Sequence, residues 1–193
     1  MFIQTQTTPN PATLKFLPGQ DVSPATPYEF ASRDEAVASP LASALFGVTG
    51  ISGVFFGSDF VSITKSDDAD WAVVKPQALA AIMDHFVSGA PLLADAAPGA
   101  QAPVDQDDTV YDGETAEIVA EIKELIATRV RPAVANDGGD IVFRRFDVDT
   151  GIVHLSMRGA CSGCPSSALT LKQGVENLLR HYVPEVTAVE AAA

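Results

Sequence analysis

The two cysteines of this chain, Cys161 and Cys164, are the residues best suited to chemistry, and the chain has no others. They lie three residues apart in the sequence GACSGCPSS, residues 159–167, at the entry to a predicted helix. Thiolates at this spacing can bind a metal ion, bind an iron–sulfur cluster or exchange a disulfide. Gly159 and Gly163 carry no Cβ, so the backbone can wrap closely around a bound group. Which of the three chemistries applies is the functional question.

The elements on either side of this cysteine loop are expected to favour the thiolate. A predicted strand brings Cys161 to the sheet edge, and a predicted helix begins at or just behind Cys164. Free N–H groups and the positive end of the dipole at the start of that helix stabilise negative charge. We therefore expect thiolate rather than thiol here, within a polar rim formed by Ser162, Ser166 and Ser167.

Ligand counting separates the interpretations of the cysteine pair. An inert, buried pair is disfavoured by the glycines and the polar rim. Disulfide exchange fits a C-x-x-C motif between a strand and a helix, but a thioredoxin-like fold needs more elements than the one helix and one short strand that follow here. Zinc and iron–sulfur clusters typically take four protein ligands, whereas one chain supplies Cys161 and Cys164. A symmetric dimer would supply the full set, and the spacing itself does not distinguish zinc from a cluster.

The three histidines do not extend this ligand set. His154 lies on a predicted strand and His181 in a predicted amphipathic helix, neither of them at ligand spacing from the cysteine loop. His85 lies among apolar residues of a predicted helix. All three are predicted to be structural.

Residues 1–88 are predicted to form a compact α+β domain with an antiparallel sheet. Its predicted strands cover residues 2–7, 13–17, 53–56 and 60–65, the last two joined as a β-hairpin. Ser39 followed by Pro40 marks the start of a short helix over residues 40–46. A second helix over 76–88 is predicted to bury Leu79, Ile82, Met83 and Phe86. The sequence shows no catalytic constellation in this domain.

Residues 89–113 differ sharply in composition from the segments on either side. Alanine, proline, glycine and aspartate dominate, and the segment has no basic residue. Such a sequence buries too little apolar surface to offset its ordering entropy. It is therefore predicted to be a flexible, acidic linker.

Residues 114–193 are predicted to form a second small domain with the element order αββαβ. The predicted segments are a helix over 114–131 that Pro132 kinks or ends, strands over 141–148 and 152–158, a helix from Pro165 to Tyr182, and a last strand over 186–189. Residues 136–140, NDGGD, form a dense turn signal before the first of these strands. The overall fold class is thus α+β with two small domains.

Composition excludes several classes of partner. The formal net charge is −13, from 12 basic and 25 acidic side chains, which argues against binding to nucleic acid or to an anionic membrane surface. No apolar run approaches the roughly 20 residues of a membrane helix. The first residues, MFIQTQTTPNPATLKF, lack the features of a secretory or transit peptide. The expected location is a bacterial-type cytoplasm, or an organelle matrix if the chain is a processed form; either compartment keeps thiols reduced.

Three segments of the second domain resemble the C-terminal domain of NifU-like proteins. They are residues 130–132 (VRP), residues 136–140 (NDGGD) and the cysteine loop. Residues 8–16, TPNPATLKF, resemble the N-terminal domain of the Nfu subgroup. The two matches span nearly the whole chain apart from the predicted linker.

This resemblance implies a non-enzymatic carrier of iron–sulfur clusters. It implies a [4Fe-4S] cluster that bridges two protomers as a homodimer, with Cys161 and Cys164 as ligands and no catalytic residue. It also implies apo-protein targets and upstream cluster-assembly proteins as partners. The sequence contains neither the cysteine-bearing scaffold domain nor the ferredoxin-like middle domain of full-length NifU, which favours storage and transfer over de novo assembly. A dithiol–disulfide exchange protein and a zinc-bridged structural dimer are the alternatives.

Overall fold

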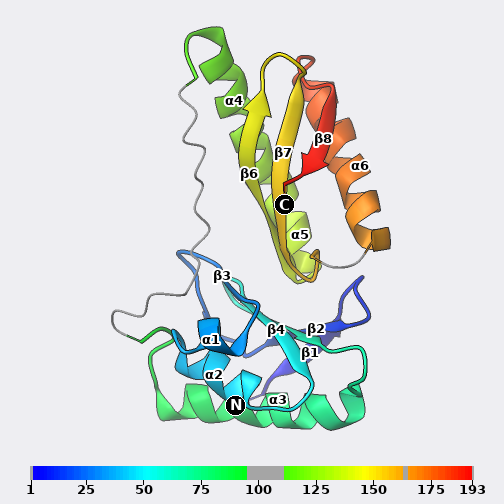
Figure 1. Ribbon diagram of the computed structural model, residues 1–193. Coiled ribbons are helices and arrows are strands. Elements are labelled where there is room, and N and C mark those ends of the chain that lie inside the picture. Colours follow the sequence, from blue (N-terminus) through cyan, green and yellow to red (C-terminus); the bar gives the residue numbers. More distant parts are fainter. Residues whose placement is uncertain (1, 95–110, 163–164, 193) are drawn as a thin grey trace.

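The computed structural model describes residues 2–94, 111–162 and 165–192, and it shows two domains, each built on one β-sheet with helices (Figure 1). The α+β class with two small domains is therefore confirmed. Most of the predicted linker, residues 95–110, lies outside the described residues. Its flexibility and the boundaries 1–88, 89–113 and 114–193 stay predictions.

The N-terminal sheet has five strands, and all of its neighbouring strands are antiparallel, as predicted. In spatial order the strands are β1 (Gln4–Thr7), β2 (Thr13–Leu17), β5 (Val61–Lys65), β4 (Ile51–Phe56) and β3 (Tyr28–Phe30). Strand β3 was not predicted from the sequence. It is three residues long and follows the proline-rich segment 24–27, so it shows too little alternation to be detected.

Three helices belong to this domain: α1 (Arg33–Ala36), α2 (Pro40–Phe46) and α3 (Trp71–Ser88). The predicted cap of α2 is confirmed, since the Ser39 hydroxyl accepts a hydrogen bond from Ala42 N. The prediction that the last helix starts at residue 76 was wrong. Asp70 caps α3 by accepting from Ala72 N, so the helix begins at Trp71 and carries Pro76 in its interior.

One face of the N-terminal sheet and the helices form a single hydrophobic core. Ala78 and Ile82 of α3 are fully buried in it, and Leu79 and Phe86 are partly buried against it. The predicted burial of Met83 was wrong: its side chain is 40% exposed. One residue along an α-helix turns by about 100°, which carries Met83 from the core side of Ile82 toward solvent.

The opposite face of the same sheet carries a straight row of paired residues across all five strands, named here the cross-sheet row. Its members, each opposite the next on the neighbouring strand, are Gln6, Lys15, Ser62, Phe55 and Glu29. Antiparallel sheets commonly expose one face to water. Here Lys15, Ser62 and Phe55 are buried, because the C-terminal domain lies over this face while α3 lies on the other (Figure 1).

The C-terminal domain has the predicted αββαβ order, except that its first helical segment has three parts. These are α4 (Glu114–Leu125), a π-helical turn η1 (Ile126–Val130) and α5 (Arg131–Asn136). The alternative that Pro132 ends the helix was wrong, while a kink at Pro132 stays a prediction. The π turn, in which Arg131 N donates to Ile126 O, comes directly before it, and the helix continues for one more turn with Pro132 near its start.

Three strands and one helix complete the domain. They are β6 (Gly139–Asp147), β7 (Ile152–Gly159), α6 (Pro165–Tyr182) and β8 (Ala188–Ala191). Strand β7 is central, antiparallel to β6 and parallel to β8, so α6 is the crossover between two parallel strands. Val153 and Leu155 of β7 are fully buried against the helices of this domain.

Replacing Ser39 by alanine is expected to lower the free energy of unfolding of the N-terminal domain by about 1–2 kcal/mol. The hydroxyl is fully buried, caps α2 and also donates to Leu92 O. Urea unfolding followed by the fluorescence of Trp71, the single tryptophan of the chain, measures the change. The matched control is Ser52→Ala, which removes an exposed hydroxyl; a loss for Ser39→Ala no larger than for this control would contradict the assignment.

Candidate functional site

Cys161 lies two residues beyond the end of β7, the central strand of the C-terminal sheet. It therefore lies at the end of the sheet and not on an edge strand. Helix α6 begins four residues later, at Pro165. Cys164 and Gly163 lie outside the described residues, so the predicted pairing of the two thiols as ligands stays a prediction.

The Cys161 side chain points into the domain and is buried, with 7% of its surface exposed. Burial, and then the negative charges of Asp137 and Asp140, raise its pKa to about 12. Against the expected thiolate, the surroundings of Cys161 therefore favour the protonated thiol. A helix start four residues away does not outweigh desolvation and two nearby carboxylates.

Gly139 leaves room for the Cys161 sulfur because glycine has no Cβ. A Cβ at Gly139 would lie 2.7 Å from Cys161 Sγ and 2.7 Å from Arg158 O, closer than real contacts allow. The sulfur thus packs against bare backbone. Cys161 also belongs to the hydrophobic cluster of this domain, so its sulfur packs against apolar side chains as well. A thiol is a soft donor of the kind that holds iron–sulfur clusters, but in this conformation the Cys161 sulfur is buried inside the domain.

An ion pair connects the first helical segment with the strand that carries Gly139. Arg131 donates from Nε to Asp140 Oδ1 at 2.8 Å and from a terminal nitrogen to Asp140 Oδ2 at 2.9 Å. This bidentate geometry fixes the relative position of α5 and β6. The segments VRP and NDGGD, which the sequence presented as separate motifs, are thus held together at the cysteine loop.

Side chains of the N-terminal domain bind the backbone around the cysteine loop. Ser62 Oγ donates to Gly138 O at 2.6 Å, and Glu29 Oε1 accepts from Gly159 N at 2.9 Å. Asn10 Nδ2 lies 3.5 Å from Ser162 O and donates to it. Sequence reasoning missed all of these contacts, because they join residues that lie far apart in the chain.

Lys15 makes the fourth contact between the domains. Its ammonium group donates to Ala135 O at 2.8 Å, at the carboxyl end of α5, and lies 4.3 Å from the centre of the Phe60 ring. Burial lowers the pKa of Lys15. A lysine within an otherwise apolar strand segment, LKF, was the available sequence signal, because lysine is rarely buried without a partner.

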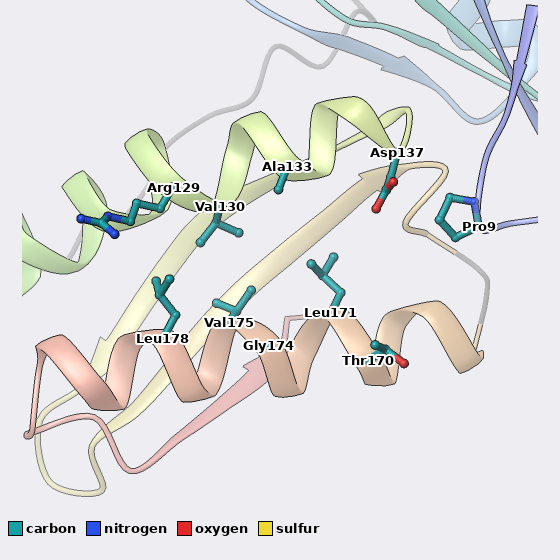
Figure 2. Close-up of a pocket in the computed structure, with 10 residues that line it drawn as sticks. All are labelled: Pro9, Arg129, Val130, Ala133, Asp137, Thr170, Leu171, Gly174, Val175 and Leu178. Atoms are coloured by element: carbon teal, nitrogen blue, oxygen red, sulfur yellow. The ribbon is translucent and has the colours of Figure 1, made fainter.

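An apolar groove of about 580 Å³ lies between α5 and α6, close to the cysteine loop (Figure 2). Val130, Leu171 and Leu178 point into it, while Arg129 and Asp137 lie toward its opposite ends. None of its lining residues is a thiol. The groove offers contact surface and not thiolate chemistry.

The remaining candidate ligands do not gather at Cys161. His154 lies on β7 with its ring 3.4 Å from the Arg145 guanidinium, and His181 lies at the end of α6 with its ring against Tyr182. His85 is buried in α3 beside Phe86. Within residues 2–94, 111–162 and 165–192, no three histidine, cysteine, aspartate or glutamate side chains are grouped as a metal site. No helix in that part of the chain is long and apolar enough to cross a membrane.

Two protein families match this sequence. The family described as "Scaffold protein Nfu/NifU N terminal" matches residues 3–89. The family described as "NifU-like domain" matches residues 122–190, which include the cysteine loop.

Known proteins resemble the chain over nearly its whole length. NifU-like protein 5, mitochondrial, from Arabidopsis thaliana is 52% identical over 190 residues, which cover 98% of this chain and 67% of that protein. NFU1 iron-sulfur cluster scaffold homolog, mitochondrial, from Drosophila erecta is 52% identical over 191 residues, with coverages of 98% and 64%. The chain thus spans about two thirds of the length of these relatives. A solution structure of a NifU-like protein from Saccharomyces cerevisiae gives a TM-score of 0.44 at 25% identity, covering 49% of this chain and 86% of that one.

Substituting Gly139 by alanine is expected to destabilise the C-terminal domain by about 1–3 kcal/mol, because the added methyl group collides with Cys161 Sγ and with backbone. Urea unfolding followed by circular dichroism measures this loss. The matched control is Gly174→Ala in α6, where nothing lies within 4 Å of the added Cβ. That control is expected to gain about 0.5–1 kcal/mol; equal effects of the two variants would contradict the close packing of the sulfur.

The Cys161 thiol is expected to stay protonated through neutral and mildly alkaline pH in the folded, metal-free protein. Its pKa is raised to about 12, so the thiolate forms only well above the ordinary thiol pKa of about 8.5. The chemical shift of the isotope-labelled Cys161 Cβ in a Cys164→Ser variant follows the titration. The same variant in urea should titrate near the ordinary value. Half-titration of the folded protein below pH 9 would contradict the burial described above.

Proposed function

Because the chain belongs to the NifU-like family of iron–sulfur cluster scaffold proteins, we propose that it carries a [4Fe-4S] cluster shared between two protomers and transfers it to apo-proteins. The observation that carries the proposal is the half-site at the end of β7. A soft thiol packs there against a glycine backbone, in a chain that has one other cysteine.

The ligand count supports a shared site. A [4Fe-4S] cluster takes four thiolates, and each chain has Cys161 and Cys164. Two chains related by a twofold axis supply the set without any other residue. On this proposal the functional unit is a homodimer when the cluster is bound.

The protonation of Cys161 supports transfer over permanent storage. Cluster binding requires the thiolate, so the bound state must displace a proton that burial, Asp137 and Asp140 hold on the sulfur. When the cluster leaves, the proton returns and the thiol is buried again. The metal-free state is thereby stabilised, which makes the cluster easier to release to an incoming cysteine ligand.

The proposal assigns the chain no catalytic residue. Its partners are apo-proteins that need clusters and assembly proteins that supply them. The relatives named above are mitochondrial proteins, which is consistent with an organelle matrix, while a bacterial cytoplasm stays a prediction. Either compartment is reducing and keeps both cysteines available as thiols.

Anaerobic reconstitution with iron and sulfide is expected to give a brown dimer with about two irons per chain, since two chains share a four-iron cluster. Metal analysis, visible absorption and size-exclusion chromatography measure content, cluster and assembly together. Cys161→Ala and Cys164→Ala should each abolish loading while the fold is retained. The matched control is Ser162→Ala, which leaves both thiols in place.

Two results would overturn the proposal in different ways. A colourless protein that exchanges disulfides would indicate a dithiol–disulfide exchange protein. About half a zinc ion per chain with no visible absorption would indicate a zinc-bridged structural dimer. Full cluster loading in either cysteine variant would place the ligands elsewhere.

A further inference from the structure

We propose that the N-terminal domain is an internal clamp on the cysteine loop, bound through the cross-sheet row, and that this clamp opens before a second chain completes the cluster site. The first half of this proposal concerns the metal-free chain alone. The second half rests on the function proposed above.

The clamp holds the backbone on both sides of Cys161. Glu29 accepts from Gly159 N, two residues before the cysteine, and Asn10 donates to Ser162 O, one residue after it. Glu29 lies on β3 and Asn10 in the turn between β1 and β2, so both ends of this short segment are bound to the N-terminal domain. The segment is held in the conformation that turns the sulfur inward, against Gly139 and the domain core.

The same surface holds the turn that lies beneath the sulfur. Ser62 donates to Gly138 O, and Lys15 donates to Ala135 O one turn earlier. Lys15, Ser62 and Glu29 all belong to the cross-sheet row: Lys15 and Ser62 are adjacent in it, and Phe55 lies between Ser62 and Glu29. One regular sheet face therefore recognises the carbonyl and N–H groups of the cysteine loop and its supporting turn.

Two phenylalanines add apolar surface at this contact. Phe55 and Phe60 are each 2% exposed, yet they belong to neither of the two core clusters found among the described residues. Phe55 lies against Gly159, where a Cβ would approach the ring to 3.0 Å, and both rings border a cavity shared with Pro132 and Ala135. Their burial comes from the meeting of the two domains, which indicates a built interface.

The interface also carries polar groups that favour reopening. Arg158 is buried, and one of its terminal nitrogens has no hydrogen-bond partner. Burial raises the pKa of Glu29 and lowers that of Lys15, so both charges are less stable here than in water. Separation of the domains rehydrates all three groups, which offsets part of the lost contact. Interfaces of this polar kind between domains commonly allow relative motion.

Closure of the clamp and formation of the cluster-bound dimer both require the cysteine loop. A shared cluster needs the sulfur turned outward and the loops of two chains facing each other. In the closed chain the loop faces the N-terminal sheet instead (Figure 1). The clamp therefore protects the metal-free thiol and competes with the second chain for the loop.

Ser62→Glu opens the clamp in the full-length, metal-free chain, because it replaces the donor to Gly138 O with a carboxylate near Asp137 and Asp140. In a Cys164→Ser background, alkylation of Cys161 by iodoacetamide is expected to be about tenfold faster, the effect of losing one buried hydrogen bond and adding repulsion. Amide exchange at Gly159 should accelerate by a similar factor. Ser62 does not bond to Gly159, so this second change reports separation of the domains.

The matched control is Ser52→Glu, which places the same charge at an exposed position of the same sheet and should leave both rates within about twofold of the parent. Lys15→Met removes the donor to Ala135 O without adding negative charge, and it should also accelerate both the alkylation of Cys161 and the amide exchange of Gly159. If Ser62→Glu does not fold, this variant tests the clamp. The unfolding midpoint followed by Trp71 fluorescence reports whether each N-terminal domain is intact. Unchanged rates in a folded variant would overturn the clamp.

Failure of the clamp and failure of the proposed function are separable. The alkylation and exchange measurements use metal-free protein and stand whether or not a cluster forms. In reconstituted protein, exchange at Gly159 should rise to the rate of the opened variant, because the second chain displaces the sheet. A brown dimer in which Gly159 stays as protected as in the metal-free chain would overturn the requirement for opening and leave cluster binding intact.

Discussion

The close approach of two strands and of side chains from the N-terminal domain is the constraint on which the rest of this structure depends. The start of β6, the end of β7 and the N-terminal sheet meet at Gly138, Gly139 and Gly159, and a Cβ at any of the three would lie 3.0 Å or less from a neighbouring group. Gly138 and Gly159 also have positive φ, which glycine adopts without strain. Absence of side chains at these points allows the sulfur, the turn and the sheet to share one small volume.

The two faces of the N-terminal sheet make different kinds of contact. One face packs on its helices and forms an ordinary core that includes Phe16 and Phe56. The other presents hydrogen-bonding side chains, such as Ser62, to peptide groups of the C-terminal domain. Recognition of backbone rather than side chains tolerates sequence change in the loop, as long as its conformation is kept.

The sequence predicts much of this fold, because its signals are local. Helix α6, strand β7 and the cap at Ser39 follow from periodicity and from turn and cap residues. The protonation of Cys161 did not follow, since it depends on burial and on carboxylates brought near by folding. The clamp was also inaccessible to sequence reasoning: its contacts join residues between 76 and 152 positions apart.

The π-helical turn η1 sets the rotation of the following helix, α5, about its axis. One extra residue in a helical turn rotates the following helix by about 100° relative to an unbroken α-helix. Arg131, which bonds to Asp140, and Ala135, whose carbonyl oxygen accepts from Lys15, both follow this turn. The π turn Ile126–Val130 therefore helps to orient α5 toward the N-terminal domain, although the two domains have no strand in common.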